Sequence, residues 1–237
     1  DLLLTGVTDA DMAYLENLTG LRRLDLTHTR ITDTGLIHLK GLTSLQHLQL
    51  GSNAITDAGI EHLTDLTQLR QLDLSKTQVT DAGLERLKAL TELEQLDLSG
   101  SKITGPGLAH LEGLTKLQSL SLNGTPITGT GLEHLKALTE LRFLSLRESQ
   151  ITDGGLAYLE GMTRLQILEL TDTQITDAGL AHIKGLTGLE GLGLSSGRIT
   201  DQGLEHLKNL PNLKQVNFDG HPTPSSALFS TGGAEKA

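Results

Sequence analysis

The sequence predicts an α/β solenoid, in which one strand and one helix alternate along a repeat of 24 residues. Three observations lead to this prediction. Leucines with a fixed spacing return every 24 residues, a second phrase keeps the same period, and aromatic residues are only 2% of the chain. Because large rings are scarce, leucine must supply most of the buried apolar area, which is typical of a regular, layered interior.

The leucine pattern has the form L-x-x-L-x-L and first occurs at Leu21, Leu24 and Leu26. Its first leucine then returns at Leu45, Leu69, Leu93, Leu117, Leu141, Leu165, Leu189 and Leu213, without insertion or deletion. We interpret these as nine copies, with Asp1 and Leu2 as the end of a tenth. A single repeat cannot bury its leucines alone, so each copy needs its neighbours.

The second phrase is Ile-Thr-Asp-x-Gly-Leu, as at residues 31–36, and it recurs at 55–60, 79–84, 151–156, 175–180 and 199–204. Before it, residues 23–27 alternate apolar and polar side chains, which predicts a strand with one buried face. Asp33 stands where a helix N-cap is expected. Leu36 and Leu39 follow at helical spacing. Gly41 suits a left-handed position after the helix.

Successive strands should be parallel, because a helix returns the chain each time. Helices are wider than the strand spacing of about 4.8 Å, so the stack should curve into a horseshoe with a concave sheet and convex helices. We expect a repeat domain over residues 1–219 and a C-terminal tail or partial cap over 220–237, with Leu228 and Phe229 over the last repeat. Leu2–Leu4 begin inside a strand without a cap, so either more chain precedes them or this edge pairs with another molecule.

These motifs resemble the leucine-rich-repeat superfamily over residues 1 to about 219, with a helix phrase similar to the ribonuclease-inhibitor-like and cysteine-containing subclasses. The Cys or Asn that ends the strand in F-box members is mostly a hydroxyl residue here, at Thr29, Asn53, Thr77, Ser101, Thr125, Ser149 and Thr173. The exact repeat with Thr is more similar to bacterial members. No F-box is visible, so ubiquitin-ligase function does not carry over. The resemblance implies a protein-binding scaffold without chemistry of its own.

A partner site is predicted where the outward rows of the sheet depart from their polar pattern. Phe143 and Ile167 fall on neighbouring strands, so their side chains should touch and face solvent. The charged residues around them are Arg147, Glu148, Glu169 and Asp172. An apolar centre with a charged rim is typical of an interaction hot spot. The alternative is that these are ordinary exposed apolar residues, which are common on soluble proteins.

Two further features of the predicted concave face have open interpretations. Gly191 and Gly193 remove the side chains from one strand, which leaves either a hollow beside the apolar centre or a relaxed repeat near the end of the stack. Asp25, Asp73 and Asp97 form an acidic zone in the N-terminal half. This zone either attracts a basic partner or is a solvated face that keeps the protein soluble.

Several classes of function are disfavoured. The formal net charge of -10 repels nucleic acid and anionic membranes. No apolar run approaches the roughly 20 residues of a membrane helix. No nucleophile motif and no phosphate loop is present. Six histidines share one outward helix position, too far apart for a shared metal, so we expect a structural or solvated role for His38, His62, His110, His134, His182 and His206.

The sequence therefore predicts a non-catalytic scaffold that binds a macromolecular partner, expected to be a protein, on its concave face. We expect no enzyme activity, no cofactor and no metal, and we expect a monomer. The alternatives are an adaptor or effector module that recruits a substrate within a larger protein, a structural role, or an engineered repeat scaffold. The chain has no Cys and no signal-peptide pattern, which slightly favours a cytoplasmic location.

Overall fold

A computed structural model describes residues 6–219 and the backbone of 221–224. Ten strands form a single sheet and follow the chain order. They are β1 (Arg23–Asp25), β2 (His47–Gln49), β3 (Gln71–Asp73), β4 (Gln95–Asp97), β5 (Ser119–Ser121), β6 (Phe143–Ser145), β7 (Ile167–Glu169), β8 (Gly191–Leu194), β9 (Gln215–Phe218) and β10 (His221–Pro224). Strands β1 to β9 are parallel, and paired residues are 24 positions apart, as in Arg23 with His47. The predicted solenoid with one open sheet is confirmed.

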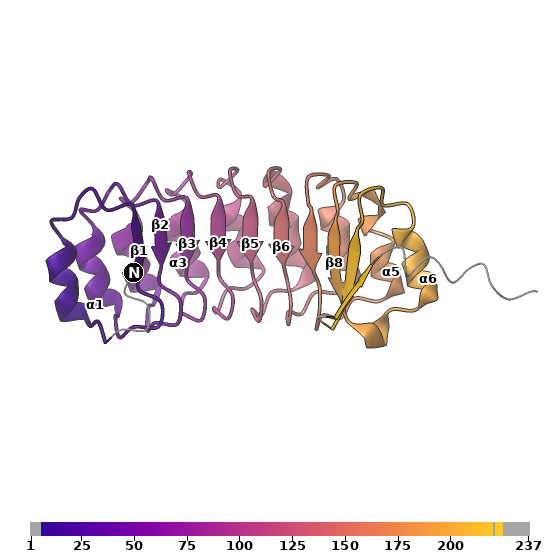
Figure 1. Ribbon diagram of the computed structural model, residues 1–237, viewed down its shortest axis with the longest axis horizontal. Helices are drawn as coiled ribbons and strands as arrows, with labels where there is room; N and C mark the ends of the chain where they lie inside the picture. The colour runs from indigo at the N-terminus through magenta and orange to yellow at the C-terminus, as the bar shows by residue number, and fades with distance from the viewer. Residues whose placement is uncertain (1–5, 220, 225–237) are drawn as a thin grey trace, which may run out of the picture.

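In Figure 1 the helical segments of the middle repeats lie behind the strands, α1 lies beside β1 at one end, and α5 and α6 lie beyond β8 at the other. The α-helices are α1 (Asp33–Leu36), α2 (Asp57–Ile60), α3 (Asp81–Leu87), α4 (Asp153–Leu156), α5 (Asp177–Leu180) and α6 (Asp201–Leu204). The 3₁₀ segments are η1 (Asp9–Leu15), η2 (Ile37–Leu39), η3 (Glu61–Leu63), η4 (Pro106–Leu111), η5 (Gly129–Ala137), η6 (Ala157–Leu159), η7 (Ile183–Gly185), η8 (Ser196–Arg198) and η9 (Glu205–Leu207). In the described part of the chain, no helix combines the length and apolarity needed to cross a bilayer.

The predicted helical segment follows the strand in each described repeat, but among the described segments only α3 is α-helical over the whole stretch from the aspartate to the second leucine. A single α-helical turn is followed by 3₁₀ structure in most repeats, as where η2 follows α1. The glycine inside the phrase, such as Gly35, lowers helix stability, and 3₁₀ turns are the tighter form used in short segments. The left-handed conformation expected at Gly41 is wrong for that residue, which has no positive φ, but it occurs at the equivalent Gly161, with φ of 92°. The other positive φ values follow the strands, at His28, Ser52, Lys76, Gly100, Gly124, Glu148, Asp172 and Asp219.

The core is one continuous cluster of leucine and isoleucine between sheet and helices. Each repeat contributes the same positions, so that Leu48, Leu72 and Leu96 lie side by side under the sheet and are at most 2% exposed. Buried hydroxyl and amide groups close the turn after each strand. Thr77 Oγ1, for example, donates to the carbonyl of Leu74 at 2.6 Å. The Thr, Ser or Asn at the strand end therefore satisfies its polar side-chain atoms on the backbone, except at Ser101, whose buried hydroxyl has no hydrogen-bond partner among the described residues.

The predicted N-cap at Asp33 is wrong, and the structure gives this aspartate another role. Thr32 is the N-cap of α1, and its side chain accepts from the backbone N–H of Thr34. The carboxylate of Asp33 reaches into the next repeat, where it accepts from the N–H of Thr56 at 2.8 Å and from its hydroxyl at 2.6 Å. The same link starts from Asp9, Asp57, Asp81, Asp153 and Asp177. These bonds join neighbouring repeats and explain why the aspartate keeps the period.

The aspartate ladder is interrupted at Gly105 and Gly129. At these two repeats the backbones themselves come together. A Cβ added to Gly131 would lie 2.4 Å from the Cα of Gly105, and one added to Gly155 would lie 2.6 Å from the Cα of Gly129. Elsewhere the equivalent glycine faces the aspartate carboxylate, as Gly59 faces Asp33. Glycine pairs thus replace a hydrogen-bonded link by direct backbone contact in the middle of the stack.

The C-terminal edge of the parallel sheet is covered by β10, which pairs antiparallel with β9. This strand lies in the segment for which a tail or partial cap was expected. Two of its four residues are prolines, which lack the N–H needed to extend a sheet. Strand β10 therefore ends the ladder. Leu228 and Phe229 lie outside the described residues, as do Leu2–Leu4 at the other end.

Candidate functional site

One face of the open sheet is not covered by helices, and alternate side chains of each strand lie on it (Figure 1). We call this surface the sheet face. Phe143 and Ile167 lie on this face and pair in register between β6 and β7. Ile167 is 39% exposed and Phe143 is half-buried. Ile167 is thus the only large apolar side chain classed as exposed on the described strands. The structure brings the two predicted residues together on adjacent strands.

The four residues predicted to rim this centre differ in their surroundings. Arg147 is half-buried beyond the end of β6, and its backbone N–H donates to Asn123 Oδ1 at 3.1 Å. Glu148 and Asp172 are exposed and occupy left-handed turn positions, with φ of 55° and 59°. Glu169 is half-buried on β7, and burial raises the pKa of its carboxyl, while the positive charge of Arg147 lowers it. Of the four predicted rim residues, Arg147 and Glu169 are therefore half-buried, and Glu148 and Asp172 are exposed.

The strand next to Ile167 carries Gly191 and Gly193, and the structure gives these two glycines different roles. Beside Gly191 there is a hollow of about 280 Å³, which lies between Ile167 and the last strands. Its other lining residues are Gln166, Glu169, Glu190, Lys214, Gln215 and Asn217. Above Gly193 there is no free space, because the Oε2 atom of Glu169 lies 2.0 Å from where a Cβ would stand. The glycines create one hollow and one seat for a neighbouring carboxylate.

The three aspartates of the predicted acidic zone lie in one row of the sheet face, and each carboxylate already has a hydrogen-bond partner. Asp25, Asp73 and Asp97 each accept the backbone N–H two residues further on, at 2.9, 2.7 and 2.8 Å. Each aspartate thereby fixes the turn that follows its strand. Burial raises the pKa of the Asp73 carboxyl most, against the lowering effect of its hydrogen bonds to Ser75, and the charges of Asp97 and Asp25 raise it further. The three aspartates therefore stabilise the turns after their strands, and their charges also make the local potential negative.

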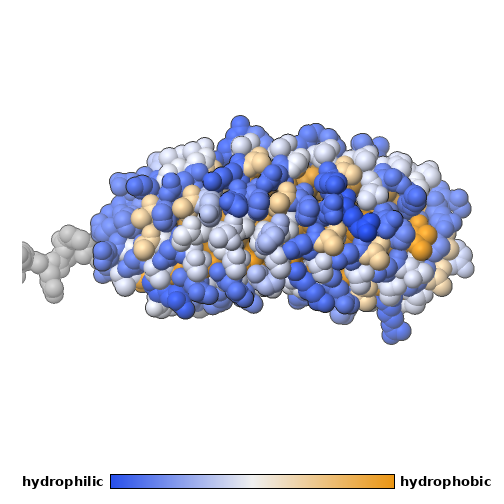
Figure 2. Space-filling model, turned by 180° about the vertical axis from the view of Figure 1, so that it is seen from behind, coloured by the Kyte–Doolittle hydropathy of each residue, from blue (hydrophilic) through white to orange (hydrophobic). Residues whose placement is uncertain are grey.

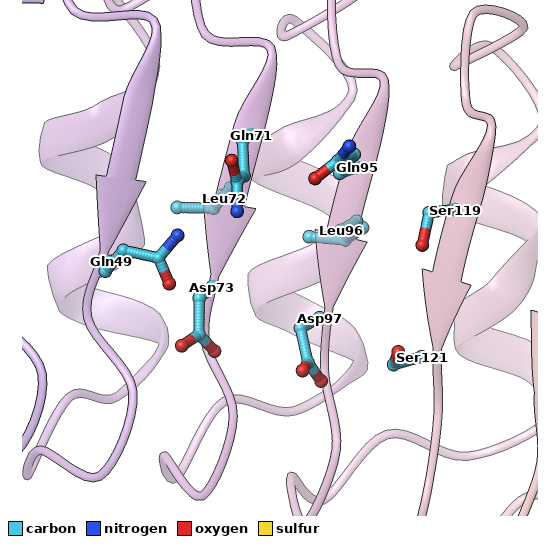
Figure 3. A pocket seen from close by; sticks show the side chains of 9 residues that line it. All are labelled: Gln49, Gln71, Leu72, Asp73, Gln95, Leu96, Asp97, Ser119 and Ser121. Carbon is cyan, nitrogen blue, oxygen red and sulfur yellow. The ribbon is translucent and has the colours of Figure 1, made fainter. Parts of the chain in front are cut away.

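Beside Asp73 and Asp97 lies a shallow hollow of about 160 Å³ that the sequence did not predict (Figure 3). Figure 3 shows Gln71 and Gln95 side by side on β3 and β4, with Asp73 and Asp97 side by side below them. The remaining lining residues are Gln49, Leu72, Leu96, Ser119 and Ser121. The signal was present in the sequence, since all the polar members belong to two rows of 24-residue spacing. Chemically this hollow offers amide, hydroxyl and carboxylate groups without an aromatic surface.

The opposite face, which carries the helices, is mainly hydrophilic with scattered apolar residues (Figure 2). Among the described residues, the large apolar side chains that are exposed outside the strands are Tyr14, Leu18 and Ile37, all in the first repeats. Three of the histidines in the shared row pair with a glutamate of the preceding repeat, with Nδ1 to Oε1 distances of 2.5 Å in His38–Glu16 and 2.9 Å in His182–Glu160. Within the described residues, no three His, Cys, Asp or Glu side chains are placed to hold a metal ion.

The arrangement defines a repeat solenoid with an open sheet, a class of protein that serves as an interaction scaffold. Two family profiles described as leucine-rich repeat match the chain, one over residues 19–79 and the other over 89–111, 113–136 and 162–183. Together they cover just over half of the sequence. The chain therefore belongs to the leucine-rich-repeat superfamily.

Solved structures agree with this assignment. An internalin (InlF) from Listeria monocytogenes is 31% identical with a TM-score of 0.75, over 88% of this chain and 57% of the internalin. Internalin C2 from the same species is 29% identical with a TM-score of 0.69, over 90% of this chain and 84% of the internalin. The plant peptide hormone receptor RGFR1, in complex with RGF2, is 19% identical with a TM-score of 0.58, over 87% of this chain and 33% of the receptor, and shows the fold alone. The chain thus spans little more than half of the first internalin. No curated protein sequence matched.

Leucine-rich-repeat proteins are typically non-catalytic interaction modules. The sheet face fits that role, because it presents several hollows and one apolar centre on a ladder of parallel strands. The residues that depart from the repeat, rather than those that obey it, distinguish this chain from a generic stack. Those departures gather on β6, β7 and β8.

Proposed function

We propose that this chain is a non-catalytic scaffold that binds a protein partner on its sheet face, with Phe143 and Ile167 at the centre of the contact. The observation that carries the proposal is the register pairing of Phe143 with Ile167 in a row that is otherwise polar or glycine. A half-buried ring beside an exposed aliphatic side chain offers apolar area that a partner removes from water. Burying an apolar side chain completely is worth about 1.5–3 kcal/mol, and part of that burial already exists here.

The rim residues of the proposal are Arg147, Glu148, Glu169 and Asp172. Charged groups around an apolar centre contribute mainly to specificity and to the rate of encounter. Asp25, Asp73 and Asp97 belong to the same face, and in this proposal they attract a partner of positive charge from the N-terminal half. The net charge of -10 also supports a basic partner, because a negative surface attracts positive charge.

The experiment uses the double variant Phe143→Ser with Ile167→Ser. A partner is captured from an extract of the source cells, identified by mass spectrometry, produced in pure form and titrated by calorimetry. We expect the double variant to bind at least about tenfold more weakly, which corresponds to about 1.4 kcal/mol, and to unfold at nearly the same denaturant concentration. The matched control is Gln95→Ala with Ser119→Ala, which alters the same row on β4 and β5. Equal affinity of the wild type and the Phe143/Ile167 variant refutes the proposal.

Assignment to the ribonuclease-inhibitor-like subclass and a monomeric state are retained as parts of the proposal. Sedimentation of the purified chain tests the second of these. A concentration-dependent dimer would contradict it.

A further inference from the structure

Four acidic residues occupy the third position of a strand on the sheet face, and one of them differs from the other three. Asp25, Asp73 and Asp97 each accept the N–H of the turn that follows. Glu169 is longer by one methylene group and makes no such bond. Its carboxylate has no hydrogen-bond donor and no cation within 4.0 Å among the described residues. The three aspartates therefore stabilise turns of the fold, whereas the carboxylate of Glu169 does not.

The position of Glu169 is nonetheless fixed by its surroundings. Its carboxylate lies over Gly193, in space that any side chain at that position would fill. Thr171 Oγ1 borders the same space, 3.2 Å from where a Cβ of Gly193 would stand. Thr171 is only 2% exposed, and its hydroxyl has no hydrogen-bond partner. Two polar groups without a partner among the described residues therefore lie beside Gly193, and of the two only the Thr171 hydroxyl is buried, where an unpaired group costs free energy.

The nearby cations do not satisfy this carboxylate. Arg147 acts on Glu169 through its charge but forms no ion pair with it. Lys214, which lines the adjacent hollow, pairs with Glu190 at 2.6 Å. The hollow itself opens between Glu169, Ile167 and Gly191. A long side chain of a partner that lies across Ile167 and Gly191 would place its terminal group next to the carboxylate of Glu169.

We propose that β7 and β8 form a seat for one basic side chain of the partner, whose guanidinium or ammonium group binds Glu169 while its aliphatic stem lies on Ile167 and Gly191. This inference rests on the proposed function and adds the chemistry of the partner: a segment in which an apolar residue stands beside arginine or lysine. Arginine suits the seat better, because its planar fork donates two bonds to one carboxylate and its stem covers apolar surface.

The test uses nuclear magnetic resonance of protein labelled with ¹³C at the isoleucine methyl groups. The Ile167 signal is assigned by its loss in Ile167→Val. The probes are the capped dipeptides acetyl-Leu-Arg-amide and acetyl-Leu-citrulline-amide, which have nearly the same shape but differ in charge. The variants are Glu169→Gln, Arg147→Gln and, as a control for the general negative field, Asp97→Asn.

We expect the arginine probe to shift the Ile167 signal and to bind about threefold to fivefold more tightly than the citrulline probe, as for a partly exposed ion pair. This preference should disappear in Glu169→Gln and persist in Asp97→Asn, which removes the same charge elsewhere. It should increase in Arg147→Gln, because a competing cation is removed.

The other outcomes separate this inference from the proposed function. Equal shifts of Ile167 with both probes overturn the basic seat and leave the apolar centre in place. A preference for arginine that survives Glu169→Gln overturns the assignment to Glu169. Absence of any shift at Ile167 with either probe overturns the seat and also counts against the apolar centre as a contact surface.

Discussion

The close contact of glycine backbones in the middle of the stack makes a sharp prediction about two neighbouring residues of α4. Gly154 is exposed, and a Cβ added there would meet no atom within 4 Å. Gly155 is buried, and a Cβ there would lie 2.6 Å from the Cα of Gly129 and 3.3 Å from its carbonyl oxygen. Optimal carbon–carbon contacts are about 3.5–4.0 Å, so the second substitution must push two repeats apart.

Both substitutions replace glycine by alanine in the same helical turn, so they share the gain in helix propensity. That gain is about 0.5–1 kcal/mol, and Gly154→Ala should show it as increased stability. Gly155→Ala adds an overpacking cost of about 1–3 kcal/mol, with a rigid backbone as the obstacle. The two substitutions therefore differ by that cost of about 1–3 kcal/mol, and at about 2–4 °C per kcal/mol their melting temperatures should separate by about 2–12 °C.

The assay is thermal unfolding by circular dichroism, repeated with urea to obtain the midpoint and slope. Gly155→Ala should also shift the backbone amide signals of the repeat that contains Gly129, whereas Gly154→Ala should not. Coincident unfolding curves for the two variants would refute the argument, because they would mean that Gly129 and Gly155 are not in backbone contact.

Three further predictions concern the ladder, the turns and the site. Asp57→Ala removes the acceptor for the N–H and hydroxyl of Thr80, at 2.8 and 2.6 Å, and should lower the free energy of unfolding by about 1–3 kcal/mol in urea. Lys76→Gly relieves a φ of 53° and should raise that free energy by up to about 1 kcal/mol; a lower urea midpoint would contradict it. Glu169→Gln should raise the melting temperature at neutral pH. The pKa of the Glu169 carboxyl is raised in the folded state, so the wild type loses stability as pH rises from 4.5 through that pKa. The melting temperatures of the two proteins should therefore converge below pH 4.5, and a difference that does not change with pH would contradict this explanation.

The architecture was predictable from the sequence because every repeat must bury the same leucines against its neighbours. A strict period of 24 residues leaves one topology, with parallel strands and helices on one side. The helix type was not predictable in the same way. Leucine spacing fixes which side chains face inward, and both α and 3₁₀ turns satisfy it. The role of Asp33 was missed for a similar reason, because its partner Thr56 belongs to the next repeat, and local rules of helix capping consider only the residues that follow.

At the proposed site, the sequence predicted which residues stand next to one another but not the bonds that they make. Phe143 and Ile167 were found because they break a polar row, and register pairing then placed them together. The three aspartates and Glu169 look alike in the sequence, since all are acidic residues at the same repeat position. Only side-chain length separates them, because an aspartate reaches the turn N–H and Glu169 instead lies over Gly193. That difference decides which carboxylate remains available to a partner.

The glycine pairs on the helix side and the proposed binding residues on the sheet side, which both depart from the repeat, lie in neighbouring repeats. On the helix side, glycine pairs join the repeats of β4, β5 and β6 by backbone contact, where other repeats use an aspartate link. On the sheet side, the apolar pair, the unpaired glutamate and the bare strand follow on β6, β7 and β8. Because Gly129 and Gly155 join the repeats of β5 and β6, a variant that separates these repeats should displace β6 and Phe143, and it should weaken partner binding as well as stability.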